Sequence, residues 1–268
     1  MFSSNPVTTI NNSIFSSSVC SESNKFYRRS MEDSHSLLLD FADILGSGYF
    51  AIFDGHAGKK AAKLASTMLG TLLDQPFKCD SHSPDQISSA ISSIFVSFNE
   101  ELCTSLLDDN SGCTALVAIF CPDQTNDDIG HIYVANLGDS LGILSTNHTY
   151  RLLSAPHNCS TESSLVHERG GFVYGSRVNG ILAVTRAFGN IHLKPYLSAS
   201  PSVFHESFSL SNPPHSLVLA CDGEAVKVVM ASSSSAEAVE SLVKYAVDNN
   251  STDNITCIVV SFNNYKAL

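Results

Sequence analysis

Seven short apolar runs, joined by polar links, constrain the fold of this chain more than any other feature. They are SLLLDF (36–41), YFAIF (49–53), TALVAIF (114–120), HIYVAN (131–136), LGIL (141–144), LVLAC (217–221) and ITCIVVSF (255–262). Short apolar runs bounded by turn signals are typical of buried strands. Because strands outnumber helices and several are joined by short links, we expect packed antiparallel sheets with helices outside, an α+β fold without alternating βαβ units.

Three further segments have the period of amphipathic helices. The first extends from Ala57 to Leu72 and places its apolar residues on one face. The second begins at Ser83, where Pro84 and Gln86 form the pattern of a capping box with proline at the first helical position. The third lies near residues 236–248. Each helix therefore has an apolar face that can cover a sheet.

The domain organisation predicted from composition is simple. Residues 1–12 are rich in Ser, Asn and Thr, and we expect them to be a flexible tail. A strand is expected from Ile14 to Cys20, and 13–268 is expected to be a single domain. Hydrophobic residues make up 43% of the chain, which is enough for a sizeable core.

Acidic residues stand at the ends of four separate apolar strands. The positions are Glu32–Asp33, Asp54–Gly55, Asp222–Gly223 and Asp253–Asn254. A single Asp-Gly pair is more often a turn signal, but turns alone do not explain aspartates at four core strands. A buried carboxylate is costly unless it is paired or binds a cation, and magnesium and manganese prefer such oxygen ligands. If the four ends converge, they predict a site for two metal ions about 3.5–4 Å apart that activate a water.

Charge, targeting signals and cysteines limit the partners and the cellular location that we expect for this protein. The formal net charge of −11 argues against nucleic acid as a partner. The second residue is Phe2 where N-myristoylation requires glycine, and no apolar run reaches the length of a membrane span. The eight cysteines include no C-x-x-C pair, which argues against zinc and favours reduced thiols. We expect a soluble monomer in the cytoplasm, the nucleus or both, with no membrane partner.

The motifs resemble, in family order, the metal-dependent type 2C serine/threonine protein phosphatases. The matching segments are RRSMED (28–33), YFAIFDGHAG (49–58), SGCTA (111–115), YVANLGDS (133–140), GGFVYGSRVNGILAVTRAFGN (170–190), LVLACDG (217–223) and STDN (251–254). They extend over nearly the whole chain. The likeness is strongest to the short, single-domain fungal members that act on stress-kinase cascades. It implies phosphorylated proteins as substrates, kinases of such a cascade among them.

The resemblance also implies a fold and a set of site residues. The fold is two packed antiparallel sheets flanked by helices, with two Mg²⁺ or Mn²⁺ ions at one end. The implied metal ligands are Asp33, Asp54, the Gly55 carbonyl, Asp222 and Asp253, with Asp139 and Asp222 at a weaker third ion. Arg28 would hold the substrate phosphate, Glu32 would act through metal-bound water, and His56 would protonate the leaving oxygen. From the residues alone, Arg28 also fits an exposed basic pair and His56 a core histidine.

Several positions depart from the family pattern. Val226 replaces a second aspartate, and Leu141, Pro156 and Asn190 replace the usual Arg, Asp and Asp. These changes spare the two-metal site and bear on the third ion, so we expect phosphatase activity that can be slow. Two alternatives remain: a pseudophosphatase that binds phosphoproteins without turnover, and a hydrolase of small phosphate esters. Specificity is expected in loops, including residues 191–200.

Overall fold

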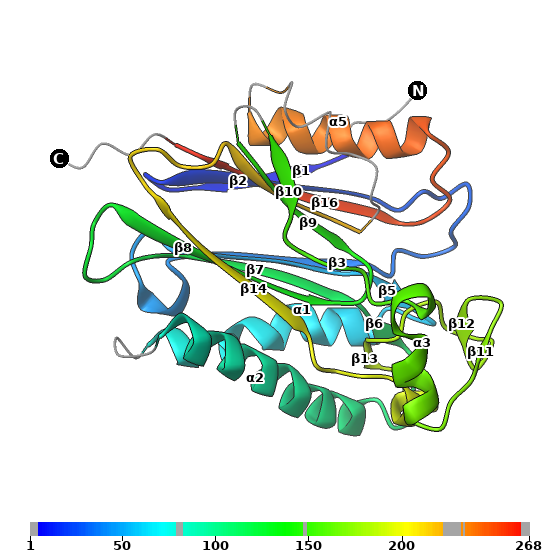
Figure 1. Ribbon diagram of the computed structural model, residues 1–268. Helices are drawn as coiled ribbons and strands as arrows, with labels where there is room; N and C mark the ends of the chain where they lie inside the picture. The colour runs from blue at the N-terminus through cyan, green and yellow to red at the C-terminus, as the bar shows by residue number, and fades with distance from the viewer. Residues whose placement is uncertain (1–4, 79–82, 147–148, 222–231, 233, 264–268) are drawn as a thin grey trace.

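Two antiparallel sheets pack face to face, and helices cover both outer faces (Figure 1). The computed structural model describes residues 5–78, 83–146, 149–221, 232 and 234–263. Helix α5 lies over one sheet, and helices α1 and α2 lie under the other. The expected sandwich of two sheets flanked by helices is confirmed.

The first sheet has six strands in the order β1-β2-β16-β15-β9-β10. Their bounds are Val7–Asn11 (β1), Phe15–Glu22 (β2), Ile255–Phe262 (β16), Ser216–Ala220 (β15), Leu141–Ser145 (β9) and Tyr150–Leu152 (β10). The two central strands, β16 and β15, are the apolar runs ITCIVVSF and SLVLA, and every residue of β15 is buried. A strand buried on both faces is expected to be a continuous apolar run.

The second sheet has five strands in the order β14-β8-β7-β4-β3. Their bounds are Ser202–Ser209 (β14), Ile129–Leu137 (β8), Ala115–Pro122 (β7), Gly48–Phe53 (β4) and Ser34–Leu39 (β3). Two small separate sheets lie at the right-hand end of Figure 1. They comprise Gly55–His56 (β5), Gly112–Cys113 (β6) and Phe188–Gly189 (β13) in one, and Val173–Tyr174 (β11) and Arg177–Val178 (β12) in the other.

The described helices fill the outer layers. They are α1 (Lys60–Leu73), α2 (Pro84–Ser105), α3 (Cys159–Glu168) and α5 (Ser235–Asp248), with 3₁₀ turns η1 (Phe41–Asp43), η2 (Gln75–Phe77) and η3 (Lys194–Tyr196). Helix α2 begins with the predicted capping box: the Ser83 side chain accepts from the Gln86 amide, and the Gln86 side chain accepts from the Ser83 amide. None of the helices among the described residues is long and apolar enough to cross a membrane.

The core forms in three layers that follow this arrangement. One apolar cluster lies between the five-stranded sheet and helices α1 and α2, and it includes Phe53, Leu69 and Phe95. A second fills the space between the two sheets, and a third lies between the six-stranded sheet and α5. A separate small cluster, built around Val166 and Val178, packs α3 against the β11–β12 hairpin. The end of the sandwich near α3 therefore has a core of its own.

The N-terminal segment differs from its prediction. Residues 7–11 form strand β1, which pairs with β2, so the expected flexible tail over 1–12 is wrong for these residues. Thr9 and Ser18 also share a side-chain hydrogen bond of 2.8 Å across the pair. The polar composition misled the prediction because an edge strand is stabilised by its backbone hydrogen bonds and needs little apolar surface of its own.

Candidate active site

The pairing of two strands brings two of the predicted metal ligands together. Ser34, the first residue of β3, is the register partner of Phe53, the last residue of β4. Asp33 precedes Ser34 and Asp54 follows Phe53, so antiparallel pairing sets these two aspartates side by side at one end of the sheet. Asp33 is buried, with 8% of its surface exposed.

Strands β15 and β16 of the six-stranded sheet also end close to Asp33 and Asp54. The Thr256 hydroxyl donates a hydrogen bond to Asp33 Oδ2 at 2.8 Å, and Cys221 Sγ lies 3.8 Å from the same oxygen. Burial, and then the carboxylates of Asp33 and Asp54, raise the pKa of the Cys221 thiol well above its ordinary value. Both aspartates therefore lie near the residue that follows β15. The next residue, Asp222, lies outside the described residues.

The turn before β16 is tied to the segment that carries Glu32. Asn254 accepts a hydrogen bond from the Glu32 amide at 2.9 Å and donates to the Ser30 carbonyl at 3.2 Å. The turn residue Asp253 accepts from Arg28, whose Nη2 lies 2.5 Å from Asp253 Oδ2. Both side chains are about half exposed. The structure thus joins Arg28, predicted to hold phosphate, to Asp253, predicted to hold metal, at the rim of the site.

Glycine at position 55 is required by a close approach of two chain segments. A Cβ atom there would lie 2.2 Å from the Glu32 carbonyl oxygen. Side-chain atoms do not approach backbone oxygens that closely, so only glycine fits. The Glu32 carboxylate in turn accepts from the Gly58 amide at 3.1 Å. These contacts hold Glu32 against the Asp54–Gly58 segment.

His56 follows on strand β5, where it is mostly buried and bonded to Asn190. Its Nε2 lies 2.8 Å from Asn190 Oδ1. A carboxamide oxygen only accepts, so Nε2 carries the hydrogen and Nδ1 is the atom that titrates. Burial lowers the pKa of His56, while the hydrogen bond to Asn190 and the charges of Asp139 and Glu32 oppose that shift. The carboxylates of Asp139 and Glu32 therefore lie close enough to His56 to stabilise its protonated form.

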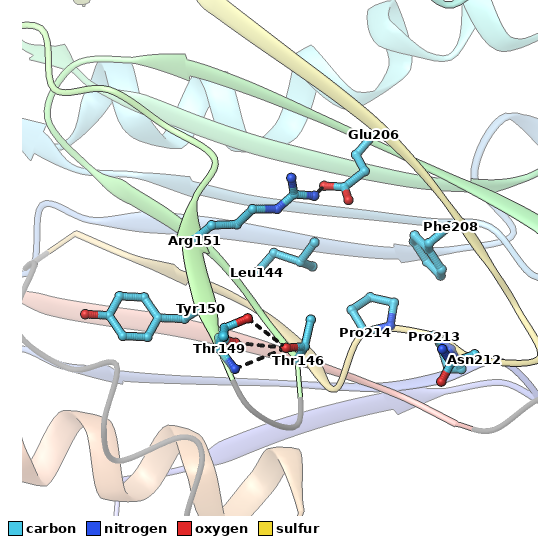
Figure 2. Close-up of a pocket in the computed structure, with 10 residues that line it drawn as sticks. All are labelled: Leu144, Thr146, Thr149, Tyr150, Arg151, Glu206, Phe208, Asn212, Pro213 and Pro214. Carbon is cyan, nitrogen blue, oxygen red and sulfur yellow. Dashed lines mark hydrogen bonds and ion pairs between the residues drawn. The ribbon is translucent and has the colours of Figure 1, made fainter.

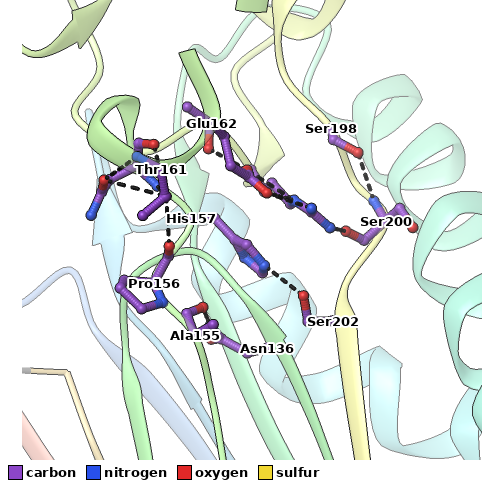
Figure 3. Close-up of polar contacts among 12 residues, drawn as sticks. Asn136, Ala155, Pro156, His157, Thr161, Glu162, Ser198, Ser200 and Ser202 are labelled. Carbon is purple, nitrogen blue, oxygen red and sulfur yellow. Dashed lines mark hydrogen bonds and ion pairs between the residues drawn. The ribbon is translucent and has the colours of Figure 1, made fainter. Parts of the chain in front are cut away.

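The loop that carries Asp139 is held by a second histidine, His157, whose ring points toward Ser202 in Figure 3. His157 Nδ1 accepts from the Gly138 amide at 3.1 Å, and its Nε2 lies 2.8 Å from Ser202 Oγ. The His157 amide also donates to the Gly138 carbonyl at 2.8 Å. Burial, and then the charge of Arg186, lower the pKa of His157 to about 4, so it stays neutral at neutral pH. Asp139 itself is exposed.

Ser111 and Thr114, in the segment SGCTA, are hydroxyl residues close to the site, and both have structural roles. Ser111 Oγ accepts from the Ala61 amide at 3.0 Å. Thr114 Oγ1 accepts from the Asp54 amide at 3.3 Å and shares a hydrogen bond with Ser140. Both are buried. They position the start of α1 and the Asp54 backbone.

Sequence reasoning missed the polar residues that position the acidic ones. Asn254 links the turn to Glu32, Thr256 holds Asp33, and Asn190 holds His56. Asn190 gave a signal, because it stands where the family motif ends in aspartate. Thr256 gave none, since a threonine inside an apolar strand is an ordinary strand residue.

The described donors fit a hard cation by their chemistry. Carboxylate and backbone carbonyl oxygens are the ligands that Mg²⁺ and Mn²⁺ prefer, and Asp33, Asp54 and Gly55, which are neighbours at this end of the sheet, carry such oxygens. Within the described ranges, however, no group of three or more His, Cys, Asp or Glu side chains is arranged to hold a metal. The Asp253 carboxylate forms an ion pair with Arg28, and Asp222 lies outside the described residues.

A cavity of ≈ 500 Å³ lies elsewhere, at the edge of the sandwich between the β9–β10 hairpin and β14 (Figure 2). Arg151 reaches across it to form an ion pair with Glu206. None of the predicted site residues lines this cavity. The acidic end of the sandwich is therefore distinct from it.

An acidic site at one end of a two-sheet sandwich has the kind of ligands that hydrolases use to hold divalent cations for activating water. Comparison with known proteins defines the family. The sequence profile of "Protein phosphatase 2C" matches residues 17–255. The chain therefore belongs to the protein phosphatase 2C family, and it is a serine/threonine protein phosphatase. The family is metal-dependent.

Relatives and solved structures agree with this assignment. Protein phosphatase 2C homolog 1 of Saccharomyces cerevisiae is 36% identical over 90% of this chain and 92% of its own length. The protein of the same name from Schizosaccharomyces pombe is also 36% identical, over 90% of this chain and 71% of its own. A serine-threonine phosphatase 2C from Toxoplasma gondii shares the fold at a TM-score of 0.77 and 20% identity, covering 97% of this chain and all of that one. The comparisons do not support the alternative of a pseudophosphatase.

Proposed function

We propose that this phosphatase hydrolyses phosphoserine and phosphothreonine in proteins at a site for two Mg²⁺ or Mn²⁺ ions. The observation that supports the proposal is the meeting of the Glu32–Asp33, Asp54–His56 and 253–256 segments at one end of the sandwich. Asp33, Asp54, the Gly55 carbonyl, Asp222 and Asp253 would hold the ions, and Asp139 would contribute to a third. When bound, the ions neutralise phosphate charge and lower the pKa of a water.

The remaining residues have separate tasks in this proposal. Arg28 lies at the rim, and a guanidinium is suited to two-point contact with phosphate oxygens. It would exchange its contact with Asp253 for the substrate phosphate. His56 would donate a proton to the leaving serine or threonine oxygen from Nδ1, because Nε2 is engaged by Asn190. Glu32 would position water from its place against the Gly58 amide.

The experiment measures hydrolysis of a phosphothreonine peptide and Mn²⁺ binding in the wild type and in Asp54→Asn. Loss of an outer-shell residue already costs about 10–100-fold at metal sites, so loss of a ligand should lower kcat/KM by about a hundredfold or more. Calorimetry should show two bound ions in the wild type and weaker binding in the variant. Asp127→Asn, which changes an exposed aspartate in the β7–β8 loop, is the matched control and should behave as the wild type.

Two results would overturn the proposal. One is a wild type that, with Mn²⁺ present, leaves phosphopeptides intact. The other is an Asp54→Asn enzyme that keeps full activity and full metal binding. A higher kcat/KM for phosphorylated metabolites than for phosphopeptides would instead identify the enzyme as a hydrolase of small phosphate esters.

A further inference from the structure

A second cavity adjoins His56. Its volume is ≈ 420 Å³, and it is lined by Ala57, Asn110, Asn179, Ile181, Asn190, His192, Leu193 and Tyr196. Ala57 is the chain neighbour of His56, and Asn190 is its hydrogen-bond partner. The cavity therefore shares a wall with the proposed proton donor.

The chemistry of this cavity differs from that of the acidic site beside it. Among the described residues that line it there is no carboxylate, lysine or arginine, and the titratable side chains are His192 and Tyr196. Ile181, Leu193 and Tyr196 give the cavity an apolar character. A volume of this size lies within the usual range for ligand pockets. A side chain that enters the cavity would be selected mainly by apolar contact, because the described lining offers no permanently charged side chain to pair with an ionic group.

The walls of the cavity are fixed by hydrogen bonds. The Asn190 carbonyl accepts from the Leu193 and Lys194 amides at 2.7 and 2.8 Å, which sets the turn that carries the Leu193–Tyr196 wall. Another residue of the lining, Asn179, accepts a hydrogen bond at its Oδ1 from the Phe172 amide at 2.9 Å. Asn190 thus positions both His56 and one wall of the cavity, so the two sites have a fixed spacing.

Apolar side chains continue from the cavity onto the surface. Ile181 is 63% exposed, and Phe172 and Tyr174 on the same hairpin region are 56% and 76% exposed. A Cβ built on Gly180 would lie 3.7 Å from the Tyr174 ring, which places that ring beside Ile181. Exposed apolar side chains that gather around a hollow commonly mark an interaction site.

We propose that this cavity binds an apolar side chain of the protein substrate next to the phosphorylated serine or threonine. The inference rests on the proposed function, because the occupant must extend from the phosphate that reacts near His56. An extended chain advances about 3.3–3.6 Å per residue, so a residue one or two positions away reaches a cavity that begins at Ala57. The enzyme then prefers phosphosites with leucine, methionine or phenylalanine as a near neighbour.

The test uses two phosphothreonine peptides that differ only in the residues flanking the phosphothreonine, leucine in one and asparagine in the other. Asparagine is close to leucine in size and uncharged, so repulsion from the acidic site does not enter the comparison. We expect the wild type to have a kcat/KM at least about tenfold higher for the leucine peptide, since apolar pockets discriminate by about that factor per missing methylene. In Ile181→Asp this ratio should fall toward one, and Ile181→Leu should keep it.

Leu152→Asp is the matched control. Leu152 is a similarly exposed aliphatic residue on β10, outside the lining of the cavity, and its variant should keep the wild-type ratio. Equal kcat/KM for the two peptides in an active wild type would overturn the cavity assignment and leave the proposed function standing. So would an unchanged ratio in Ile181→Asp. A wild type that hydrolyses neither peptide nor p-nitrophenyl phosphate would overturn both proposals.

Discussion

His56 meets an uncharged partner in this chain, because residue 190 is asparagine where the family motif has aspartate. Asparagine and aspartate at position 190 differ in charge, but either can accept the hydrogen bond from His56 because both side chains carry an oxygen. Asn190 also has a positive φ of 51°, a conformation that asparagine and aspartate tolerate better than most residues. The identity of one residue thus sets the charge beside the proposed proton donor without changing the backbone.

We predict that Asn190→Asp raises the pKa of His56. A carboxylate in hydrogen-bond contact stabilises the imidazolium, typically by about one unit or more, and so opposes the lowering by burial. A general acid acts in its protonated form, so the alkaline limb of the pH–kcat profile should move to higher pH. NMR titration of the His56 ring measures the pKa directly. An unchanged His56 pKa in a folded variant would show that residue 190 does not control its charge.

At the scale of elements, the sequence predicted what burial dictates and missed what backbone pairing dictates. Strands β4, β7 and β16 were predictable because each is a continuous apolar run. Strand β14 was missed because SVFHESFS is mostly polar and half-buried, although it pairs with β8 along its whole length. Helix α3 was missed for a similar reason, since it buries only Cys159 and Val166.

The same contrast holds at the candidate site. The sequence predicted the acidic strand ends, because a charge beside an apolar run is costly without a partner. It could not predict which polar residues hold them. Asn254 reaches Glu32 from 222 positions away in the chain, and the pairing of β2 with β16 helps to bring these segments together. Such long-range pairs leave no local pattern.

Helix α3 is attached to the rest of the molecule by an ion pair, and we predict that Glu162→Gln loosens it. The Glu162 carboxylate accepts from Arg186 at 2.5–3.0 Å and from the Thr185 hydroxyl at 2.7 Å, and both members of the ion pair are mostly buried. Hydrogen bonds to charged groups contribute about 1.5–3 kcal/mol, so local opening should become easier by about 2 kcal/mol. Amide hydrogen exchange in α3 should then be roughly 30-fold faster.

The control for this prediction is Glu168→Gln, which changes an exposed glutamate in the same helix. It should leave exchange in α3 unchanged. Exchange in β4 and β7 should be unaffected in both variants, because α3 packs on its own small apolar cluster. Equal acceleration across the central strands would mean that the ion pair stabilises the whole molecule and has no specific role at α3.

At the scale of the whole molecule, the two sheets share one apolar interior, and strand ends and edges carry the polar chemistry. The two ends of the five-stranded sheet carry different polar groups. Asp33 and Asp54 lie at one end, and a chain of Asp123, His131 and His205 lies toward the other, joined by hydrogen bonds of 2.9 and 3.1 Å. We expect this second group to make the stability of the fold depend on pH.

We predict that part of the acid sensitivity of the fold comes from His205. Burial, and then the charge of His131, lower the pKa of His205, while Asp85 opposes the shift. A histidine whose pKa is lowered on folding binds protons less readily in the folded state than in the unfolded one. Its contribution is therefore intact above the unfolded pKa of about 6.5, and the free energy of unfolding falls as pH drops below that value. His205→Asn should lose less stability than the wild type between pH 7 and pH 5 in urea titrations. Parallel curves for the two proteins would show that His205 does not contribute to the acid sensitivity.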